Sequence, residues 1–148
     1  MYDYFVAAMR CAGCGAASPA DSSTDLQTHI RYDARGIEIP VGFQLHARDA
    51  TDRRIEGSGY LPIGHGRAEG RSRLLDTWSC PTCEHENWAC VTIVGTAVVA
   101  IEGVTLDRAT LESAQFITES CFIAAAQVSG LPSQEITDPV SVLLERLP

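Results

Sequence analysis

The segment SCPTCE, residues 79–84, holds two cysteines separated by two residues, and RCAGCG, residues 10–15, holds a second such pair. Two cysteines at this spacing can bend round one metal ion in a tight turn, and tetrahedral zinc takes four such ligands. We therefore expect one site with these metal ligands: Cys11, Cys14, Cys80 and Cys83. The chain between the pairs would then be an insertion that leaves and re-enters the same end of a sheet.

The residues next to each pair favour tight turns. Gly15 follows the first pair, where a residue free to take a positive φ helps backbone amides turn towards the thiolates, and Pro81 stiffens the second turn. The sequences CAGCG and CPTCE resemble the two knuckles of zinc-ribbon proteins, CxxCG and CPxCG. The resemblance implies a structural Zn²⁺. Glu84 stands where that pattern has Gly, and the spacer is longer than usual, which bears on the ribbon topology rather than on the metal.

The cysteine pattern also allows other interpretations. Rubredoxin also has paired CxxC knuckles, and a resemblance to it would imply an iron electron carrier. The compact rubredoxin chain, however, lacks the C-terminal helices expected here. A catalytic zinc keeps an open position beside three protein ligands, whereas four cysteines close the shell. A redox switch would need exposed, reactive thiols. His85 could donate to the site, while Cys90 and Cys121 are predicted to be small buried core residues.

Length and composition indicate one folded unit. The chain has 148 residues, of which 45% are hydrophobic and 20% charged, as is typical of a globular domain. We expect a single domain, 1–148, with a zinc-ribbon-like β region at 1–106, an insertion at 15–79 and a helical region at 107–148. The opening residues do not resemble a signal peptide and no apolar run is long enough for a membrane helix, which favours a cytoplasmic protein with reduced thiols. All eleven basic residues are arginine, a composition typical of high-GC bacteria.

The hydrophobic pattern predicts strands in the first two thirds of the chain. Apolar and polar residues alternate in 26–33 and 37–48, and residues 2–10 are rich in aromatic and β-branched residues. Residues 88–106 form two β-branched runs around Gly95-Thr96, which predicts a hairpin. The Gly- and Arg-rich stretch 49–73 is expected to be an exposed excursion.

The last third of the sequence predicts helices. Asp107 is a candidate N-cap for a helix over 108–129 that ends at Gly130, and Asp138-Pro139 predicts a second, short helix. A buried stripe at helical spacing comprises Leu111, Ala114, Thr118, Cys121, Ala125 and Val128. The expected fold is therefore α+β: an antiparallel sheet with a four-cysteine zinc-ribbon-like site and C-terminal helices packed on it.

Charge restricts the possible functions. The net charge is −8, so nucleic acid is an unlikely partner and a protein partner or a small anionic ligand is expected. Five residues on polar faces of 29–73 are candidate ligand-binding residues: His29, Arg31, His46, Arg48 and His65. The leading hypothesis is a small zinc-stabilised accessory, adaptor or ligand-binding protein. The alternatives are a small enzyme with structural zinc that uses His46, His65 and Arg48, and a DNA-associated regulator that uses the terminal helices.

Overall fold

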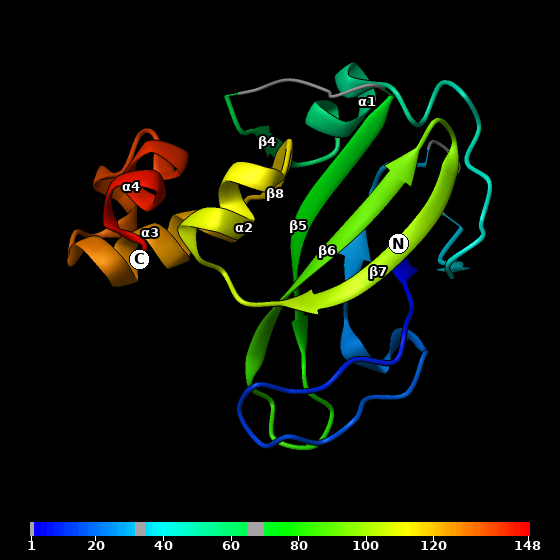
Figure 1. Cartoon of the computed structure of the whole chain (residues 1–148), viewed down its shortest axis with the longest axis horizontal. Coiled ribbons are helices and arrows are strands. Elements are labelled where there is room, and N and C mark those ends of the chain that lie inside the picture. The colour runs from blue at the N-terminus through cyan, green and yellow to red at the C-terminus, as the bar shows by residue number, and fades with distance from the viewer. Residues whose placement is uncertain (1, 32–34, 65–69) are drawn as a thin grey trace.

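The computed structural model describes residues 2–31, 35–64 and 70–148, and its strands form two sheets (Figure 1). The smaller sheet has the order β2 (Gln27–Thr28), β1 (Asp3–Phe5), β3 (Glu38–Ile39). The larger sheet has the order β4 (Tyr60–Pro62), β8 (Phe116–Thr118), β5 (Arg71–Ser79), β6 (Glu86–Val94), β7 (Ala97–Val104). The expected antiparallel arrangement holds for β5–β6–β7, but β8 runs parallel to β5 and β3 runs parallel to β1.

The long hairpin strands organise this sheet. Strands β5 and β6 pair over nine residues, from Arg71 opposite Val94 to Ser79 opposite Glu86. The predicted hairpin at 88–106 is confirmed as β6 and β7, with Gly95 in the turn at a φ of 60°. Glycine reaches this left-handed conformation without steric cost.

The larger sheet carries a hydrophobic core on each face. Because successive residues of a strand point to opposite faces, Leu74 and Leu75 enter different cores. The first core joins the sheet to the smaller sheet and includes Phe5, Leu26, Ile39, Leu74, Trp78 and Val91. The second joins it to the C-terminal helices and includes Leu75, Cys90, Leu111, Ile117, Cys121 and Leu143.

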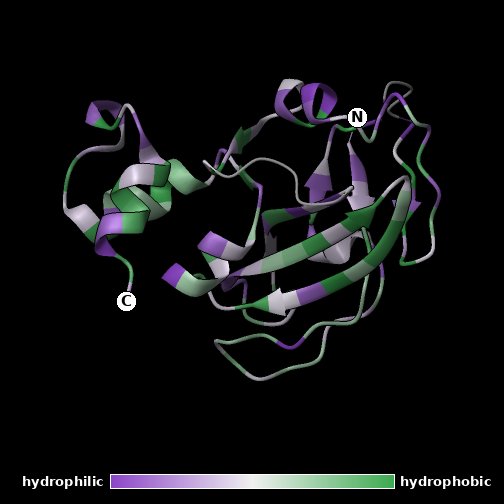
Figure 2. Ribbon diagram, turned by 45° about the horizontal axis from the view of Figure 1, so that its top comes forward, coloured by the Kyte–Doolittle hydropathy of each residue, from purple (hydrophilic) through white to green (hydrophobic). Residues whose placement is uncertain are grey.

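The helices are α1 (Asp52–Gly57), α2 (Arg108–Ser113), α3 (Cys121–Ser129) and α4 (Pro139–Arg146), with short 3₁₀ turns η1 (Ser22–Thr24) and η2 (Ser133–Glu135). Figure 2 shows hydrophobic residues on the C-terminal helices and a largely hydrophilic α1. The predicted caps are confirmed, since Asp107 accepts from the Thr110 N–H and Asp138 from the Ser141 N–H. In the part of the chain that the structure describes, no helix has the length and apolar character to cross a membrane.

The predicted continuous helix at 108–129 is wrong. Helix α2 ends at Ser113, and β8 stands between it and α3. Gln115 explains the break: its N–H donates to the Arg73 carbonyl, and its side-chain oxygen accepts from the Arg73 N–H. Its carbonyl in turn accepts from the Ile63 N–H. The open edge of β5 thus takes up this aromatic and β-branched segment as a strand, which overrides its helical spacing.

The predicted strands near the N-terminus are much shorter than expected. In the segment 26–33 the buried alternation is present at Leu26, Thr28 and Ile30, but only residues 27–28 pair as a strand. Of 37–48, only residues 38–39 form a strand, and the chain then turns with Val41 and Ala47 exposed. Strand β1 spans three residues instead of 2–10, so it offers few pairing partners to either neighbour.

The predicted exposed excursion at 49–73 is also corrected. It contains α1, β4 and the start of β5, and Ile55, Tyr60 and Ile63 are buried. Arg54 of α1 donates to the carbonyls of His29, Ile30 and Arg31. This arginine therefore satisfies the backbone where it leaves β2, rather than standing in solvent.

We expect Arg54→Met to destabilise the protein by about 2 kcal/mol, because three backbone carbonyls lose a charged hydrogen-bond donor. Arg53→Met makes the same change at an exposed neighbouring position, where an effect below about 0.5 kcal/mol is expected. Urea unfolding of the two variants beside the wild type measures the difference. Equal effects at the two positions would contradict the structural role of Arg54.

Candidate metal centre and polar pocket

The two cysteine pairs form one cluster. The sulfur atoms of Cys11, Cys14, Cys80 and Cys83 all lie within 4.8 Å of one another. The Cys11 and Cys83 sulfurs are 3.6 Å apart, and those of Cys14 and Cys80 are 3.7 Å apart. A tetrahedron with metal–sulfur bonds of about 2.3 Å has sulfur–sulfur edges of about 3.8 Å, whereas a disulfide is about 2.05 Å long. The spacing therefore fits four thiolates around one metal ion.

The two loops that carry the cysteines have the same hydrogen-bond pattern. In the first, the Gly15 N–H donates to the Cys11 carbonyl and the Cys11 N–H to the Ala16 carbonyl. In the second, the Glu84 N–H donates to the Cys80 carbonyl and the Cys80 N–H to the His85 carbonyl. The second loop is the turn between β5 and β6, and Figure 1 shows both loops at the same end of the sheet. Two equivalent tight turns thus face each other.

Each turn closes on a residue with a left-handed backbone. Gly15 has a φ of 76° and Glu84 a φ of 63°. Glu84 therefore adopts the conformation for which the zinc-ribbon pattern uses glycine, at the cost that an L-residue meets in this region. Glu84 therefore differs from the zinc-ribbon pattern in residue type but keeps the backbone conformation of the turn.

Asn87 and His85 join the two loops. The buried Asn87 side chain accepts from the Ala12 N–H at 2.9 Å, and its amide donates to the His85 carbonyl and to the Cys11 sulfur. The His85 ring packs against Gly13, where an added Cβ would lie 2.8 Å from the ring carbon Cγ. Among the described residues, the group placed to bind a metal comprises the four cysteines. His85 thus packs beside the site.

The surroundings favour thiolates at the two buried positions. The backbone N–H of Cys14 is the main cause that lowers the pKa of Cys11 to about 6. The backbone N–H of Cys83 likewise lowers the pKa of Cys80. Cys11 and Cys80 are buried, whereas Cys14 and Cys83 are exposed. Each loop therefore offers one inner and one outer sulfur, and the inner pair is anchored by backbone amides.

The two remaining cysteines lie in the second core, as predicted. Cys90 and Cys121 are buried among apolar side chains of the sheet and the C-terminal helices. Burial raises the pKa of Cys90, and it raises that of Cys121 to about 12. Both thiols are therefore neutral packing groups.

The structure separates the predicted ligand-binding residues. His29 follows β2 and lines a pocket, with its ring 4.1 Å from that of Tyr2. Arg31 pairs with the buried Asp3 at 3.3 Å and lies over the Phe43 ring. His46 and Arg48 are exposed in the turn at 46–49. His65 lies outside the described residues.

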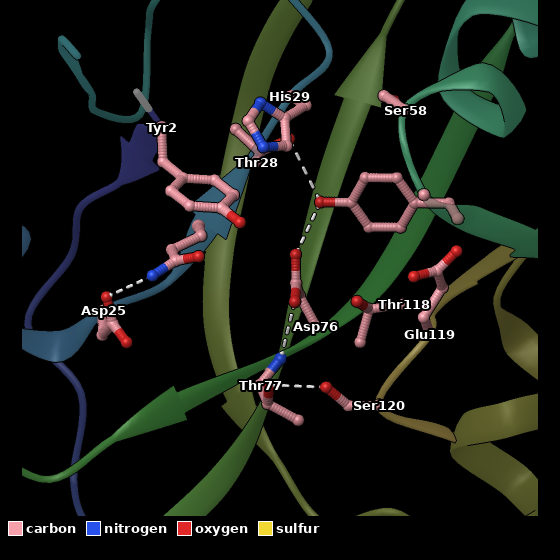
Figure 3. Close-up of a pocket in the computed structure, with 13 residues that line it drawn as sticks. Tyr2, Asp25, Thr28, His29, Ser58, Asp76, Thr77, Thr118, Glu119 and Ser120 are labelled. Carbon is pink, nitrogen blue, oxygen red and sulfur yellow. Dashed lines mark hydrogen bonds between the residues drawn. The ribbon is translucent and has the colours of Figure 1, made fainter. Parts of the chain in front are cut away.

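The pocket that His29 lines has a volume of about 340 Å³ and polar walls (Figure 3). It opens where β8, after pairing with Leu74 and Leu75 of β5, departs towards α3. Its walls come from β2, β4, β5, β8 and the segments beside them: Tyr2, Asp25, Gln27, Thr28, His29, Ser58, Gly59, Tyr60, Asp76, Thr77, Thr118, Glu119 and Ser120. Segments distant in sequence thus build one concave polar surface.

A buried carboxyl and a buried phenol meet in this pocket. The Tyr60 hydroxyl donates to Asp76 Oδ2 at 2.5 Å and also contacts the Thr28 hydroxyl, while the Thr77 N–H donates to Asp76 Oδ1. Burial raises the pKa of Asp76 to about 7, and it raises the pKa of Tyr60 well above its usual value. Perturbed groups in a cleft are typical of functional sites. The pKa of Asp76 therefore lies near neutral pH, far above that of an ordinary carboxyl group.

Neither Asp76 nor Tyr60 was among the residues predicted from the sequence. One signal was available for Asp76: it is an acid in the run RLLDTW, between Leu75 and Trp78, which are buried in β5. A charged side chain on a buried strand face needs partners or a function. Tyr60 carried no comparable signal, because its partner Asp76 is sixteen residues away and on another strand.

Comparison with known protein families, curated proteins and solved structures found no match for this chain.

We expect Glu84→Gly to stabilise the metal-loaded protein by about 0.5–1 kcal/mol, because glycine removes the steric cost of a left-handed residue. Gly15→Ala should cost about 1 kcal/mol at the equivalent position, where an added Cβ meets nothing within 4 Å and only the backbone conformation is penalised. Urea unfolding with the metal bound measures both. A loss of stability in Glu84→Gly would show that the Glu84 side chain outweighs the backbone strain.

The contribution of Asp76 to stability should depend on pH. In the folded protein the Asp76 carboxyl group keeps its proton at pH values where the same group in the unfolded chain, with a pKa of 3.8, has lost it. The contribution of Asp76 to the free energy of unfolding is therefore fully present below pH 3.8. It is lost as the pH rises to about 7, by up to about 1.4 kcal/mol per pH unit. The stability of Asp76→Asn relative to the wild type should rise with pH across this window.

Paired urea unfolding curves at several pH values measure this difference, which cancels the titration of all other groups. Glu102→Gln, an exposed change on β7, is the control and should follow the wild type. A constant difference between Asp76→Asn and the wild type would contradict the raised pKa.

Proposed function

We propose that this protein is a small zinc-stabilised accessory or ligand-binding protein in which a four-cysteine zinc ion has a structural role. The observation that carries the proposal is the sulfur cluster, whose edges of 3.6 Å and 3.7 Å match a tetrahedral tetrathiolate shell. Four thiolates leave no position for a substrate or a water nucleophile. The residues therefore fit a closed site of the zinc-ribbon type.

A structural role for the metal ion also agrees with the position of the site between the two sheets. The first loop follows β1 of the smaller sheet, and the second loop joins β5 to β6 of the larger one. An ion held by both loops would link the sheets across more than sixty residues of chain. Cross-links of this kind stabilise mainly by restricting the unfolded chain, and zinc binding energy adds directly to folding.

The electrostatic surroundings support binding of a divalent cation by thiolates. The amide donors to Cys11 and Cys80 stabilise negative sulfur, and Asn87 adds a further donor to Cys11. Hydrogen bonds of this kind orient metal ligands and offset their charge. A reducing compartment such as the cytoplasm would keep the four thiols available for metal.

Metal analysis of protein purified without added metal tests the proposal. We expect one zinc ion per chain, and Cys80→Ser should lose the metal together with the cooperative unfolding transition, because three ligands bind zinc weakly and one buried polar group is left unpaired. Cys90→Ala is the matched control: it removes a buried cysteine from the second core and should retain zinc at a cost of about 1–3 kcal/mol.

Two results would overturn the structural assignment. Four thiolates also accept iron, so bound iron with a reversible reduction potential would make the site an electron carrier. Equal unfolding transitions for the metal-loaded and metal-free protein would show that the fold does not need the ion. Mass spectrometry under native conditions and thermal unfolding after chelation distinguish these outcomes.

A further inference from the structure

The polar pocket around Asp76 has an unbalanced charge. Its charged lining side chains include the carboxyl groups of Asp25, Asp76 and Glu119, and among the described lining residues none is lysine or arginine. His29 is the basic side chain among the described lining residues. The pocket therefore favours a positively charged occupant and disfavours an anion.

Asp76 strengthens this preference because it is buried without a cationic partner. Asp76 is 5% exposed, and it accepts hydrogen bonds from the Tyr60 phenol, the Thr118 side chain and the Thr77 backbone amide. Asp3 and Asp49 each have an arginine partner, whereas no cation of the described residues pairs with Asp76. A buried carboxylate is normally paired, since isolation from water costs several kcal/mol. A cation in the pocket would supply the missing partner.

The arrangement of the acids distinguishes an organic cation from a metal ion. Metal binding needs ligand atoms that converge on one point, and in the described part of the chain only the four cysteines form such a group. The pocket carboxyls are spread over its walls, together with the hydroxyl groups of Thr28, Thr77 and Ser120. Spaced acceptors suit a ligand whose own donors are spaced, as in an ammonium or guanidinium compound.

Size and ring placement agree with this class. A volume of about 340 Å³ is at the lower end of the range of ligand pockets, about 300–1,000 Å³. The rings of Tyr2 and His29 lie together on one wall at a centroid distance of 4.1 Å (Figure 3). The face of a tyrosine ring attracts an organic cation within about 6 Å. The pocket thus offers the buried Asp76 carboxyl group and an aromatic wall.

We propose that this pocket binds a small organic cation, a primary ammonium or guanidinium compound, with the Asp76 carboxylate as its counter-ion and Tyr60 as the residue that positions Asp76. The proposal goes beyond the structural metal site and does not depend on which metal that site holds.

Binding should release a proton. Asp76 faces Tyr60 from β4 and Thr77 on its own strand, and the other titratable groups of the pocket are Tyr2, Asp25, His29 and Glu119. A bound cation stabilises the carboxylate form of Asp76, whose pKa burial raises to about 7. Binding near that pH should therefore release a fraction of a proton per bound cation.

The probes are n-butylammonium and ethylguanidinium, added to the metal-loaded full-length protein and followed by two-dimensional NMR of the backbone amides. Both should shift the amides of Thr77 and Ser120 in a saturable way, whereas butyrate and erythritol, an anion and a neutral polyol of similar size, should not. Calorimetry in buffers of different ionisation enthalpy then measures the released proton.

Asp76→Asn keeps the shape of the site and removes its charge, so it should weaken n-butylammonium binding by about tenfold or more and abolish proton release. Glu102→Gln removes one negative charge outside the pocket and should bind as the wild type does. Tyr60→Phe keeps the charge and should retain the preference for cations over butyrate. Unchanged binding in Asp76→Asn, equal binding of butyrate or erythritol, or no saturable shift with either cation would overturn the proposal.

Discussion

The nine-residue pairing of β5 with β6 is the constraint on which the rest of the structure depends. A strand presents alternate residues to opposite faces, so the register decides which side chains enter which core. In the observed register Leu74 and Trp78 face the smaller sheet, while Leu75 and Cys90 face the C-terminal helices. A slip of one residue would exchange the side chains of the two faces and so disrupt the packing of both cores. Strand β5 also receives β8 at its open edge, and this joins the C-terminal region to the sheet.

The same pairing positions the proposed metal site. Cys80 and Cys83 lie in the turn that closes the β5–β6 hairpin, so their distance and direction follow from the turn. Asn87 lies opposite Trp78 in the ladder and reaches the first loop through the Ala12 N–H and the Cys11 sulfur. The first loop therefore docks on a rigid hairpin end. A metal ion at this point would reinforce a contact that protein groups already make.

The pocket arises where the regular pairing of β5 stops. Strand β8 covers Leu74 and Leu75 and then leaves, so Asp76 and Thr77 lie beside a space instead of a neighbouring strand. An aspartate at a core-facing position costs stability, and its raised pKa records that cost. Local choices that oppose the fold are expected at functional sites, where stability is exchanged for chemistry. The end of the β5–β8 pairing and the buried Asp76 therefore both occur at the pocket.

Short-range features of the sequence determined the cysteine turns, the hairpin at Gly95-Thr96 and the helix caps at Asp107 and Asp138. Each depends on residues within a few positions of one another, so spacing and backbone preference decide them. The helical spacing correctly indicated burial at Leu111, Ala114, Cys121 and Ala125. It was wrong at Val128, which is exposed, and Thr118 is half-buried because β8 interrupts the helix. Tertiary structure decided the fate of that segment, because only the open edge of β5 could supply partners for Gln115. Tertiary structure also decided the roles of Arg54 and Asp76. Arg54 binds the carbonyls of His29 and Ile30, and Asp76 binds the phenol of Tyr60, all of which come from distant segments. Contacts between distant segments carry no periodic signal in one sequence, and the pocket that they build therefore became visible only in the folded chain.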